Sequence, residues 1–332
     1  MKIGKISQNV LKRSMLAPLQ YKREEAILEP AVEEMCFGVS CKDDEELLFA
    51  DTVLYGNEKD LGVFALARVM NDLATRGADT VGVGVRIMLP PYAYESRLKA
   101  MIEHIEQAGS MHGVQVLSAK AEVSPVIHST IVYVSGIGVV KKGCILQSSK
   151  GGPGQDVVLL KWIGLEGTFR VMREKRQELA QRFVPAFLHK IDELEPQLFS
   201  VDALKIAREY GATAMHQITD GGILAALWEM GDASNVGLEV DLKAMSIRQE
   251  TIEVCEHYHM NPYQLTSAGS ALIFTKQGEA LVEKYQEMGL CATLLGKTTM
   301  DKARVILGGE EKRFIDKPLP DEILKLYEED IR

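Results

Sequence analysis

The sequence lacks the features that mark secreted, membrane-spanning and nucleic-acid-binding proteins. Its five cysteines are scattered without a C-x-x-C pair, and because an odd number closes no disulfide framework, we expect reduced thiols and a cytoplasmic protein. No run reaches the roughly 18 apolar residues of a membrane span, and the basic N-terminal stretch has no apolar segment like that of a signal peptide. A formal net charge of −9 argues against a nucleic-acid partner, because phosphate backbones are bound by basic surfaces.

What the sequence does contain is the composition and element pattern of a two-domain α/β protein. Its 332 residues, 46% of them hydrophobic and 26% charged, suffice for two globular domains. Strand-like and helix-like runs alternate along the chain, which predicts α/β domains. The segment 141–156 is rich in glycine, serine and lysine, and this composition predicts a boundary between a domain at 1–150 and a second at 151–332.

The most informative stretch, 48–91, runs a strand into an acidic residue, a helix and a second strand. We expect Asp51 at the end of the first strand, and Asn71 and Asp72 inside the helix that follows. Carboxylate and carboxamide oxygens are the hard ligands that magnesium–nucleotide chemistry needs. Taken alone, Asp51 fits a turn or a helix cap, but the pair that follows it favours a metal site formed by Asp51 and Asp72.

Several blocks occur in a fixed order: Asp51-Thr52, MNDLATRGA at 70–78, EVSP at 122–125, KWIGLEGT at 161–168, AMHQITDGGILAALWEM at 214–230 and LTSAGSALI at 265–273. Together they resemble the aminoimidazole ribonucleotide synthetase superfamily, whose members include selenophosphate synthetase, thiamine-phosphate kinase and the carbamoyl-dehydrating hydrogenase maturation factor. The nearest likeness is to proteins described as hydrogenase maturation factor-like or synthetase-related. It extends over nearly the whole chain, so the blocks together indicate the fold.

The resemblance implies a two-domain α/β (α+β) fold whose N-terminal domain binds ATP and Mg²⁺ and forms a β-barrel across a homodimer. Members use ATP to phosphorylate a small molecule, or to activate an oxygen atom that is then displaced. By correspondence of motifs, Asp51, Glu122 and Asp220 would be catalytic, and Asn71 and Asp72 would bind the nucleotide. The small-molecule substrate cannot be identified from these motifs.

The first half of the chain departs from the family pattern in two places. Met35, within the segment 33–36, replaces a metal-binding aspartate. Asp43 and Asp44 could compensate, although they fit an exposed turn better. In the block 119–122 the family's histidine and threonine are absent and Lys120 has appeared, which either pairs with phosphate oxygens or points to solvent.

The turn at 217–222 departs as well. Gln217 stands where the family has a carboxylate, and Asp220 adds one nearby. Thr219, Gly221 and Gly222 remain as cofactor-binding or substrate-lining positions, and the glycine pair predicts a tight turn or a close backbone approach at the start of a helix. His216, just before the turn, fits a substrate contact or a purely structural role.

Three further positions are nucleotide-binding candidates. Gly151 and Gly152 lie in KGGPGQ, which is either a plain linker or a glycine-rich segment that approaches nucleotide, but which is no Walker A motif. Lys161 is either a phosphate partner or a solvent-facing edge lysine.

Two functional hypotheses follow from these motifs. The first is a homodimeric ATP-binding enzyme that phosphorylates or dehydrates a small molecule. The alternative is a non-catalytic paralogue that binds a ligand or regulates another protein, which the losses at Met35 and Gln217 favour. We do not expect the carbamoyl-acceptor role, because the sequence ends in LYEEDIR without the terminal cysteine that carries the thiocarboxamide in the carbamoyl-dehydrating factor.

Overall fold

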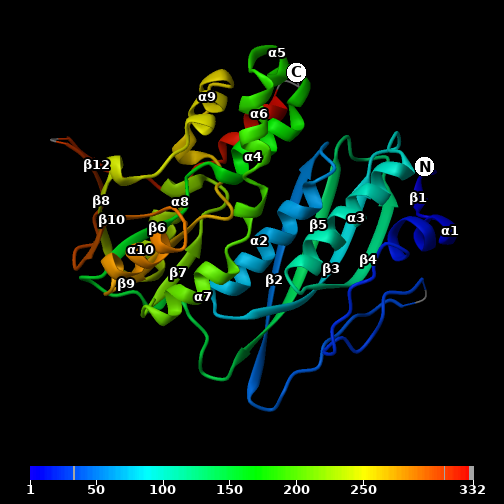
Figure 1. The fold of residues 1–332 in the computed structure, drawn as a ribbon, viewed down its shortest axis with the longest axis horizontal. Coiled ribbons are helices and arrows are strands. Elements are labelled where there is room, and N and C mark those ends of the chain that lie inside the picture. The colour runs from blue at the N-terminus through cyan, green and yellow to red at the C-terminus, as the bar shows by residue number, and fades with distance from the viewer. Residues whose placement is uncertain (33, 310, 329–332) are drawn as a thin grey trace. The chain divides into compact units, whose positions relative to one another are not determined.

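The computed structural model describes residues 1–32, 34–309 and 311–328, and the chain divides into two compact units (Figure 1). Unit 1 comprises Met1–Ala74 and Ala78–Ile145, and unit 2 comprises Thr75–Gly77 and Leu146–Arg332. Glu33, which belongs to the segment 33–36 that carries Met35, lies outside the described residues.

Unit 1 is a five-stranded sheet with two longer helices packed on it. The strand order is β1-β4-β3-β5-β2, with β3 parallel to β4 and the other pairs antiparallel. Helices α2 and α3 lie in contact, since a Cβ on Gly62 of α2 would come within 2.3 Å of Ile105 of α3 (Figure 1). The elements are β1 Gly4–Lys5, α1 Gln8–Val10 with the π-helical turn Leu11–Leu16, β2 Glu45–Gly56, α2 Leu61–Thr75, β3 Asp79–Leu89, α3 Glu95–Met111, β4 Gln115–Val123 and β5 Thr130–Lys141.

The two faces of this sheet are covered differently. Helix α2 lies so close to β5 that a Cβ on Gly136 would be 2.3 Å from Val69 and 3.3 Å from Leu73. On the opposite face of the neighbouring strand β2, Phe49 is 70% exposed and Val53 is 53% exposed. Successive side chains of a strand alternate between faces, so the sheet has one face covered by helices and one face, here called the open face, on which Phe49 and Val53 lie.

The loop before β2 covers part of the open face. Val39 joins a small core with Val81 and Ile137. Phe37 lies against Gly84, where a Cβ would approach its ring to 2.7 Å, so a side chain at that position would displace the loop. This loop therefore forms part of the surface of the open face.

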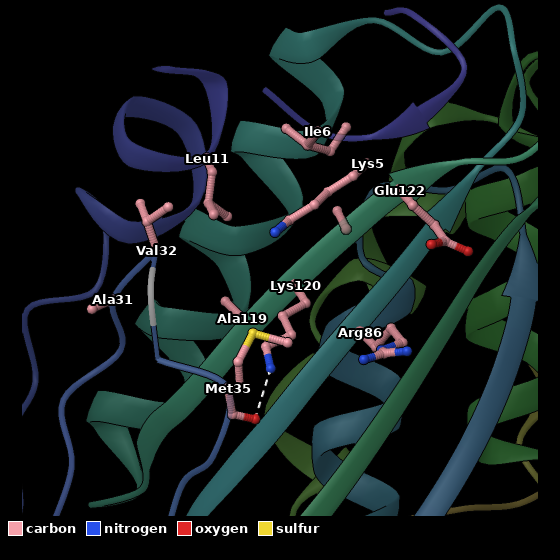
Figure 2. A pocket seen from close by; sticks show the side chains of 11 residues that line it. Lys5, Ile6, Leu11, Ala31, Val32, Met35, Arg86, Ala119, Lys120 and Glu122 are labelled. Atoms are coloured by element: carbon pink, nitrogen blue, oxygen red, sulfur yellow. Dashed lines mark hydrogen bonds between the residues drawn. The ribbon is translucent and has the colours of Figure 1, made fainter. Parts of the chain in front are cut away.

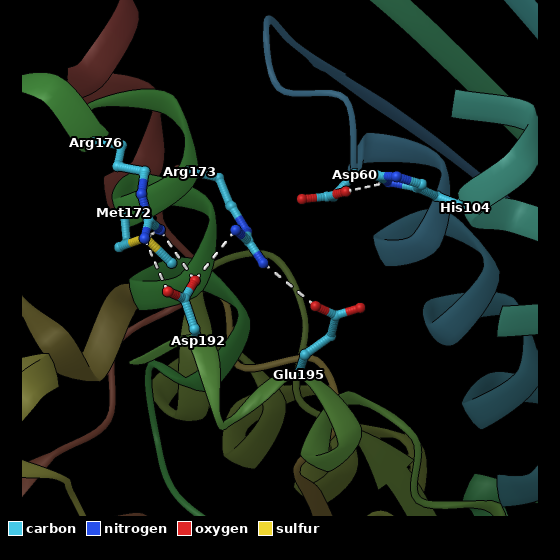
Figure 3. Close-up of polar contacts among 7 residues, drawn as sticks. All are labelled: Asp60, His104, Met172, Arg173, Arg176, Asp192 and Glu195. Atoms are coloured by element: carbon cyan, nitrogen blue, oxygen red, sulfur yellow. Dashed lines mark hydrogen bonds and ion pairs between the residues drawn. The ribbon is translucent and has the colours of Figure 1, made fainter. Parts of the chain in front are cut away.

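Unit 2 is built on a seven-stranded sheet of order β12-β11-β8-β10-β6-β9-β7. Its core includes Val157 of β6, Phe274 of β9 and Leu227 of α8. Figure 3 shows ion pairs that join α4 and α5 to α6, with Asp192 of α6 placed 2.9 Å from Arg176 of α5 and 3.1 Å from Arg173 of α4. The elements are β6 Asp156–Leu160, α4 Leu165–Glu174, α5 Arg176–Arg182, α6 Pro185–Asp192, α7 Val201–Glu209, β7 Ala214–Gln217, α8 Gly222–Ala233, β8 Gly237–Asp241, α9 Gln249–His257, β9 Ala271–Thr275, α10 Gly278–Glu287, β10 Ala292–Thr299, β11 Arg304–Gly308, β12 Glu311–Phe314 and α11 Lys325–Glu328.

The predicted α/β class is confirmed, because each unit is a sheet with helices packed on it. The prediction that Asp51 ends its strand is wrong: β2 continues without interruption to Gly56, paired with β5 along its length. Within the described ranges, no helix has both the length and the apolar character needed to cross a bilayer.

Candidate functional site

Three of the charged residues singled out by the sequence lie on the open face of unit 1. Asp51 of β2 pairs with Ser135 of β5, and Ser118 of β4 lies on the same face two positions before Lys120 and four before Glu122. Three strand spacings, roughly 14 Å, separate β2 from β4. Asp51 therefore shares a face with Lys120 and Glu122 and lies three strands away from them.

Asp51 has a local partner of its own. The hydroxyl of Tyr133 donates a hydrogen bond of 3.2 Å to Asp51 Oδ2. Partial burial, and then this carboxylate, raise the pKa of Tyr133. Since Phe49 and Val53 flank Asp51 on the same face, the carboxylate stands in an exposed and largely apolar surface.

Asn71 and Asp72 lie on α2, which covers the other face of the sheet. Asn71 is only 1% exposed, and Asp72 is half-buried. Because the sheet lies between α2 and the side chain of Asp51, the structure does not support a magnesium ion shared by Asp51 and Asp72 within one chain. Among the described residues, no group of three His, Cys, Asp or Glu side chains is arranged to hold a metal ion.

A pocket lies at the edge of the open face where β1 meets β4. Its polar residues are Lys5, Arg86, Lys120 and Glu122, contributed by three strands, and its apolar wall includes Ile6, Leu11 and Val32. Its cavity volume is about 220 Å³, below the roughly 300–1,000 Å³ of typical small-molecule sites. The pocket thus offers both cationic groups and apolar surface.

The structure brings Lys120 and Met35 together in this pocket. Lys120 Nζ donates a hydrogen bond of 2.9 Å to the carbonyl oxygen of Met35 (Figure 2). The segment in which the family resemblance predicts an acidic residue at position 35 and the block that contains Lys120 are therefore neighbours in space. A second hollow, lined by Tyr133 and Ser135, shares Arg86 and Lys120 with the first.

Sequence reasoning missed Lys5 and Arg86. Arg86 is the one charged residue between Val81 and Pro91, and strict alternation along that strand could have placed it on a polar face. Lys5 gave no comparable signal, because β1 has two residues and its position depends on pairing with β4. Asp43 and Asp44, in contrast, lie in an exposed turn before β2 as one of the alternatives predicted.

A carboxylate–imidazole pair on the helical side of unit 1 was also missed. Asp60, immediately before α2, lies 2.6 Å from His104 Nδ1 on α3 (Figure 3). The backbone carbonyl of Asp60 accepts hydrogen bonds from the N–H groups of Val63 and Phe64. An aspartate just before an apolar helical run is a start signal for a helix, but its histidine partner could be found only from the packing of α2 on α3.

In unit 2, Lys161 fits neither of its two predicted environments. It is 2% exposed, and its Nζ donates hydrogen bonds to the carbonyl oxygens of Gln197 and Phe199, the second of 2.9 Å. Burial lowers its pKa to about 7. Lys161 is therefore no solvent-facing lysine, and it holds the chain at 197–199 where the sequence suggested a phosphate partner.

The glycine pair in the turn at 219–222 has the predicted close backbone approach. Gly221 has φ of +81° and Gly222 has φ of +65°, and a Cβ on Gly222 would lie 2.6 Å from the carbonyl oxygen of Tyr263. The N–H of Gly221 donates a hydrogen bond of 2.8 Å to Asp321 Oδ2. Burial raises the pKa of Asp321 to about 6, and sequence reasoning did not find this residue because it lies far along the chain.

The other candidate site residues in and beside this turn differ in how exposed they are. Asp220 is exposed and Thr219 is half-buried, whereas Gln217 is 3% exposed. His216 Nε2 lies 3.0 Å from Glu229 on α8, which agrees with the structural alternative for that histidine.

The two glycines of the linker differ. A Cβ on Gly151 would lie 2.4 Å from the hydroxyl of Ser234, so Gly151 is required by packing. A Cβ on Gly152 would have no atom within 4 Å, and the N–H of Gly152 donates a hydrogen bond of 2.8 Å to Gln155 Oε1. This environment agrees with the linker alternative for 151–152.

Comparison with known proteins gives matches over most of the chain. A protein of Methanocaldococcus jannaschii named for hydrogenase expression/formation is 22% identical over 269 residues, 80% of this chain and 78% of that protein. The carbamoyl dehydratase HypE of Rhodobacter capsulatus is 24% identical over 268 residues, 77% of this chain and 76% of that protein. A solved structure of the hydrogenase maturation protein HypE in complex with ATP superposes with a TM-score of 0.75 at 14% identity, covering 95% of this chain and 96% of that one.

The family itself is shown by two domain matches. The N-terminal domain of AIR synthase related proteins matches residues 43–140, and the C-terminal domain of the same proteins matches residues 152–308. These segments comprise more than half of the sequence. The chain therefore belongs to the AIR synthase-related family.

Proposed function

We propose that the chain binds ATP in the pocket at the β1–β4 edge and uses it to phosphorylate or dehydrate a small molecule. The observation that carries this proposal is the convergence of Lys5, Arg86 and Lys120 on a pocket that also has an apolar wall. Cationic side chains bind phosphate oxygens by charge-assisted hydrogen bonds, and an apolar wall suits a purine ring. The solved relative whose structure contains ATP supports the same ligand.

In this proposal Lys5, Arg86 and Lys120 hold the phosphates, and their positive charge stabilises the charge that develops on a transferred phosphoryl group. Glu122 is the carboxylate among the described residues that line the pocket, and it is the proposed proton acceptor for the small-molecule nucleophile. The roles predicted for Asp51 and Asp220 stay separate proposals, since neither residue lines this pocket.

We also propose that the open face of unit 1 is where two copies of the chain associate. Phe49, Val53, Tyr55 and Tyr133 are 70%, 53%, 37% and 40% exposed on adjoining strands. Contiguous apolar surface of this kind marks interaction sites. A second copy presenting the same face would cover it, as the β-barrel implied by the family resemblance requires.

The alternative function is a non-catalytic ligand-binding protein. Asp51 and Asp72 lie on opposite faces of the sheet, and Met35 stands where a metal-binding carboxylate was predicted. These observations favour a chain that kept the fold and a ligand pocket but lost part of the machinery for phosphoryl transfer.

Calorimetric titration with ATP tests the proposal, and ³¹P NMR of the same mixtures separates its two forms. We expect a saturable binding isotherm that Lys120→Ala weakens, together with formation of ADP when a suitable acceptor is present, and of inorganic phosphate as well where that acceptor is dehydrated. Binding without turnover across candidate acceptors would support the non-catalytic alternative. Absence of any nucleotide binding by the folded chain would refute the proposed function.

A further inference from the structure

Two like charges face one another in the pocket. Arg86 of β3 and Lys120 of β4 are paired positions on adjacent parallel strands and project from the same face. Strands in a sheet lie about 4.8 Å apart, and like charges at directly opposed positions destabilise a sheet. An anion bound against the two side chains would offset this repulsion.

No carboxylate in the described residues neutralises this pair. Within the described part of the chain, the side chain of Arg86 makes no hydrogen bond or ion pair. The side chain of Lys120 has one acceptor among those residues, the carbonyl oxygen of Met35. Glu122 is opposite Lys5 in the register. Figure 2 shows, however, that Lys5 extends towards Leu11 while the Glu122 carboxylate extends the other way.

The same residues are a poor site for a divalent cation. Mg²⁺ requires a near-octahedral set of oxygen ligands and is bound in proteins through carboxylates. Among the described residues that line the pocket, Glu122 is the one carboxylate, against three cationic side chains. Met35 offers a thioether and a carbonyl oxygen, and that carbonyl already accepts the hydrogen bond from Lys120.

We propose that this pocket binds the phosphate groups of its ligand directly through Lys5, Arg86 and Lys120, without a divalent metal ion. In a phosphate-binding site lined by carboxylates, a bound metal ion supplies the positive charge that faces the phosphate groups. In this pocket the cationic side chains would supply that charge. An ammonium group carries three N–H donors, so Lys120 can hold the Met35 carbonyl and still donate to phosphate oxygens. Because the chain carries a net charge of −9, attraction of anions to its surface as a whole would not account for phosphate binding. We therefore expect the phosphate groups to bind at this pocket.

The inference deepens the proposed function, and rests on it for the identity of the ligand but not for the chemistry of the pocket. Isothermal titration calorimetry of the full chain tests it with ATP and with pyrophosphate, each in excess EDTA and in excess magnesium chloride. We expect ATP to bind in EDTA at least as tightly as in magnesium. Because each variant removes a charge-assisted hydrogen bond to phosphate, Lys120→Ala and Arg86→Ala should each weaken binding about 10-fold to 100-fold.

Two further variants sharpen the test. Lys141→Ala removes the same charge at an exposed position outside the pocket and should leave affinity unchanged. Met35→Asp introduces the missing carboxylate, so it should weaken binding in EDTA and make binding respond to magnesium. Circular dichroism of every variant checks that it is folded.

The outcomes separate the two proposals. ATP binding that requires magnesium would overturn this inference and leave the proposed function standing. Pyrophosphate binding in EDTA that Lys120→Ala abolishes, without ATP binding, would support this inference and refute the nucleotide function. Failure of the folded chain to bind either anion in EDTA would overturn the inference.

Discussion

Lys120 Nζ donates a hydrogen bond of 2.9 Å to the carbonyl oxygen of Met35, across 85 positions of sequence. The bond joins the two places where the chain departs most from its family in the N-terminal half. Met35 and Lys120 therefore line one pocket, and each makes the charge of that pocket more positive than the family resemblance predicts.

The apolar part of the open face predicts association of two chains. We expect Phe49→Lys and Val53→Lys each to convert a dimer into a monomer, because burying an unpaired ammonium group at the centre of an interface costs several kcal/mol. Sedimentation velocity over a concentration series measures the change. Phe314→Lys is the matched control, since Phe314 is 69% exposed in unit 2 and its replacement should leave the dimer intact. A wild-type chain that stays monomeric at high concentration would contradict the prediction.

The contact between Asp60 and His104 predicts coupling between the start of α2 and the middle of α3. Their side chains lie 2.6 Å apart, and a hydrogen bond to a charged group is worth about 1.5–3 kcal/mol. We expect Asp60→Ala and His104→Ala each to lower the free energy of unfolding. In a double-mutant cycle the pair should show a coupling of at least about 0.5 kcal/mol, measured by urea denaturation. Additive effects of the two substitutions would show that the contact does not stabilise the fold.

The sequence could predict what depends on local pattern and not what depends on the packing of distant segments. Alternating elements predicted the fold class, and the glycine pair at 221–222 predicted the close backbone approach observed there. The position of Asp51 was misjudged because β2 extends to Gly56 through pairing with β5, which residues 51–56 alone do not reveal. Lys5 enters the pocket only because two residues of β1 pair with β4.

The same limit applies to buried polar groups. Lys161 was predicted to be either a phosphate partner or an edge lysine, because nothing near it in the sequence indicates that its ammonium group donates to the carbonyl groups of Gln197 and Phe199. Asp321 lies 100 positions from Gly221, whose N–H it accepts. Residue type and spacing identify candidates for a polar site, and tertiary contacts decide which of them are turned inward.

Burial of Lys161 predicts a dependence of stability on pH. Its folded pKa is lowered to about 7, against about 10.4 in an unfolded chain, so between these values the unfolded state binds more protons. Stability should therefore rise with pH across this window, by at most about 1.4 kcal/mol per pH unit from this group. Lys161→Met should remove that slope in urea denaturation at a series of pH values.

Lys190→Met serves as the control for Lys161, because Lys190 is exposed on α6 of the same unit. The difference in stability between this variant and the wild type should not change with pH. Parallel stability curves for the wild type and Lys161→Met would show that the buried amine does not titrate in this range.

The last prediction contrasts Gly222→Ala with Gly152→Ala. The sequence suggested a cofactor-binding role for both glycines. Gly222 has φ of +65° and a Cβ there would meet the Tyr263 carbonyl oxygen at 2.6 Å, whereas nothing lies within 4 Å of a Cβ on Gly152. A left-handed backbone costs an alanine about 1 kcal/mol, and the collision with backbone atoms adds to that cost. We expect Gly222→Ala to lower the free energy of unfolding by about 2–4 kcal/mol and Gly152→Ala to change it by less than about 0.5 kcal/mol. Urea denaturation of both variants measures this contrast, and equal stabilities would mean that the turn at the start of α8 can relax away from Tyr263.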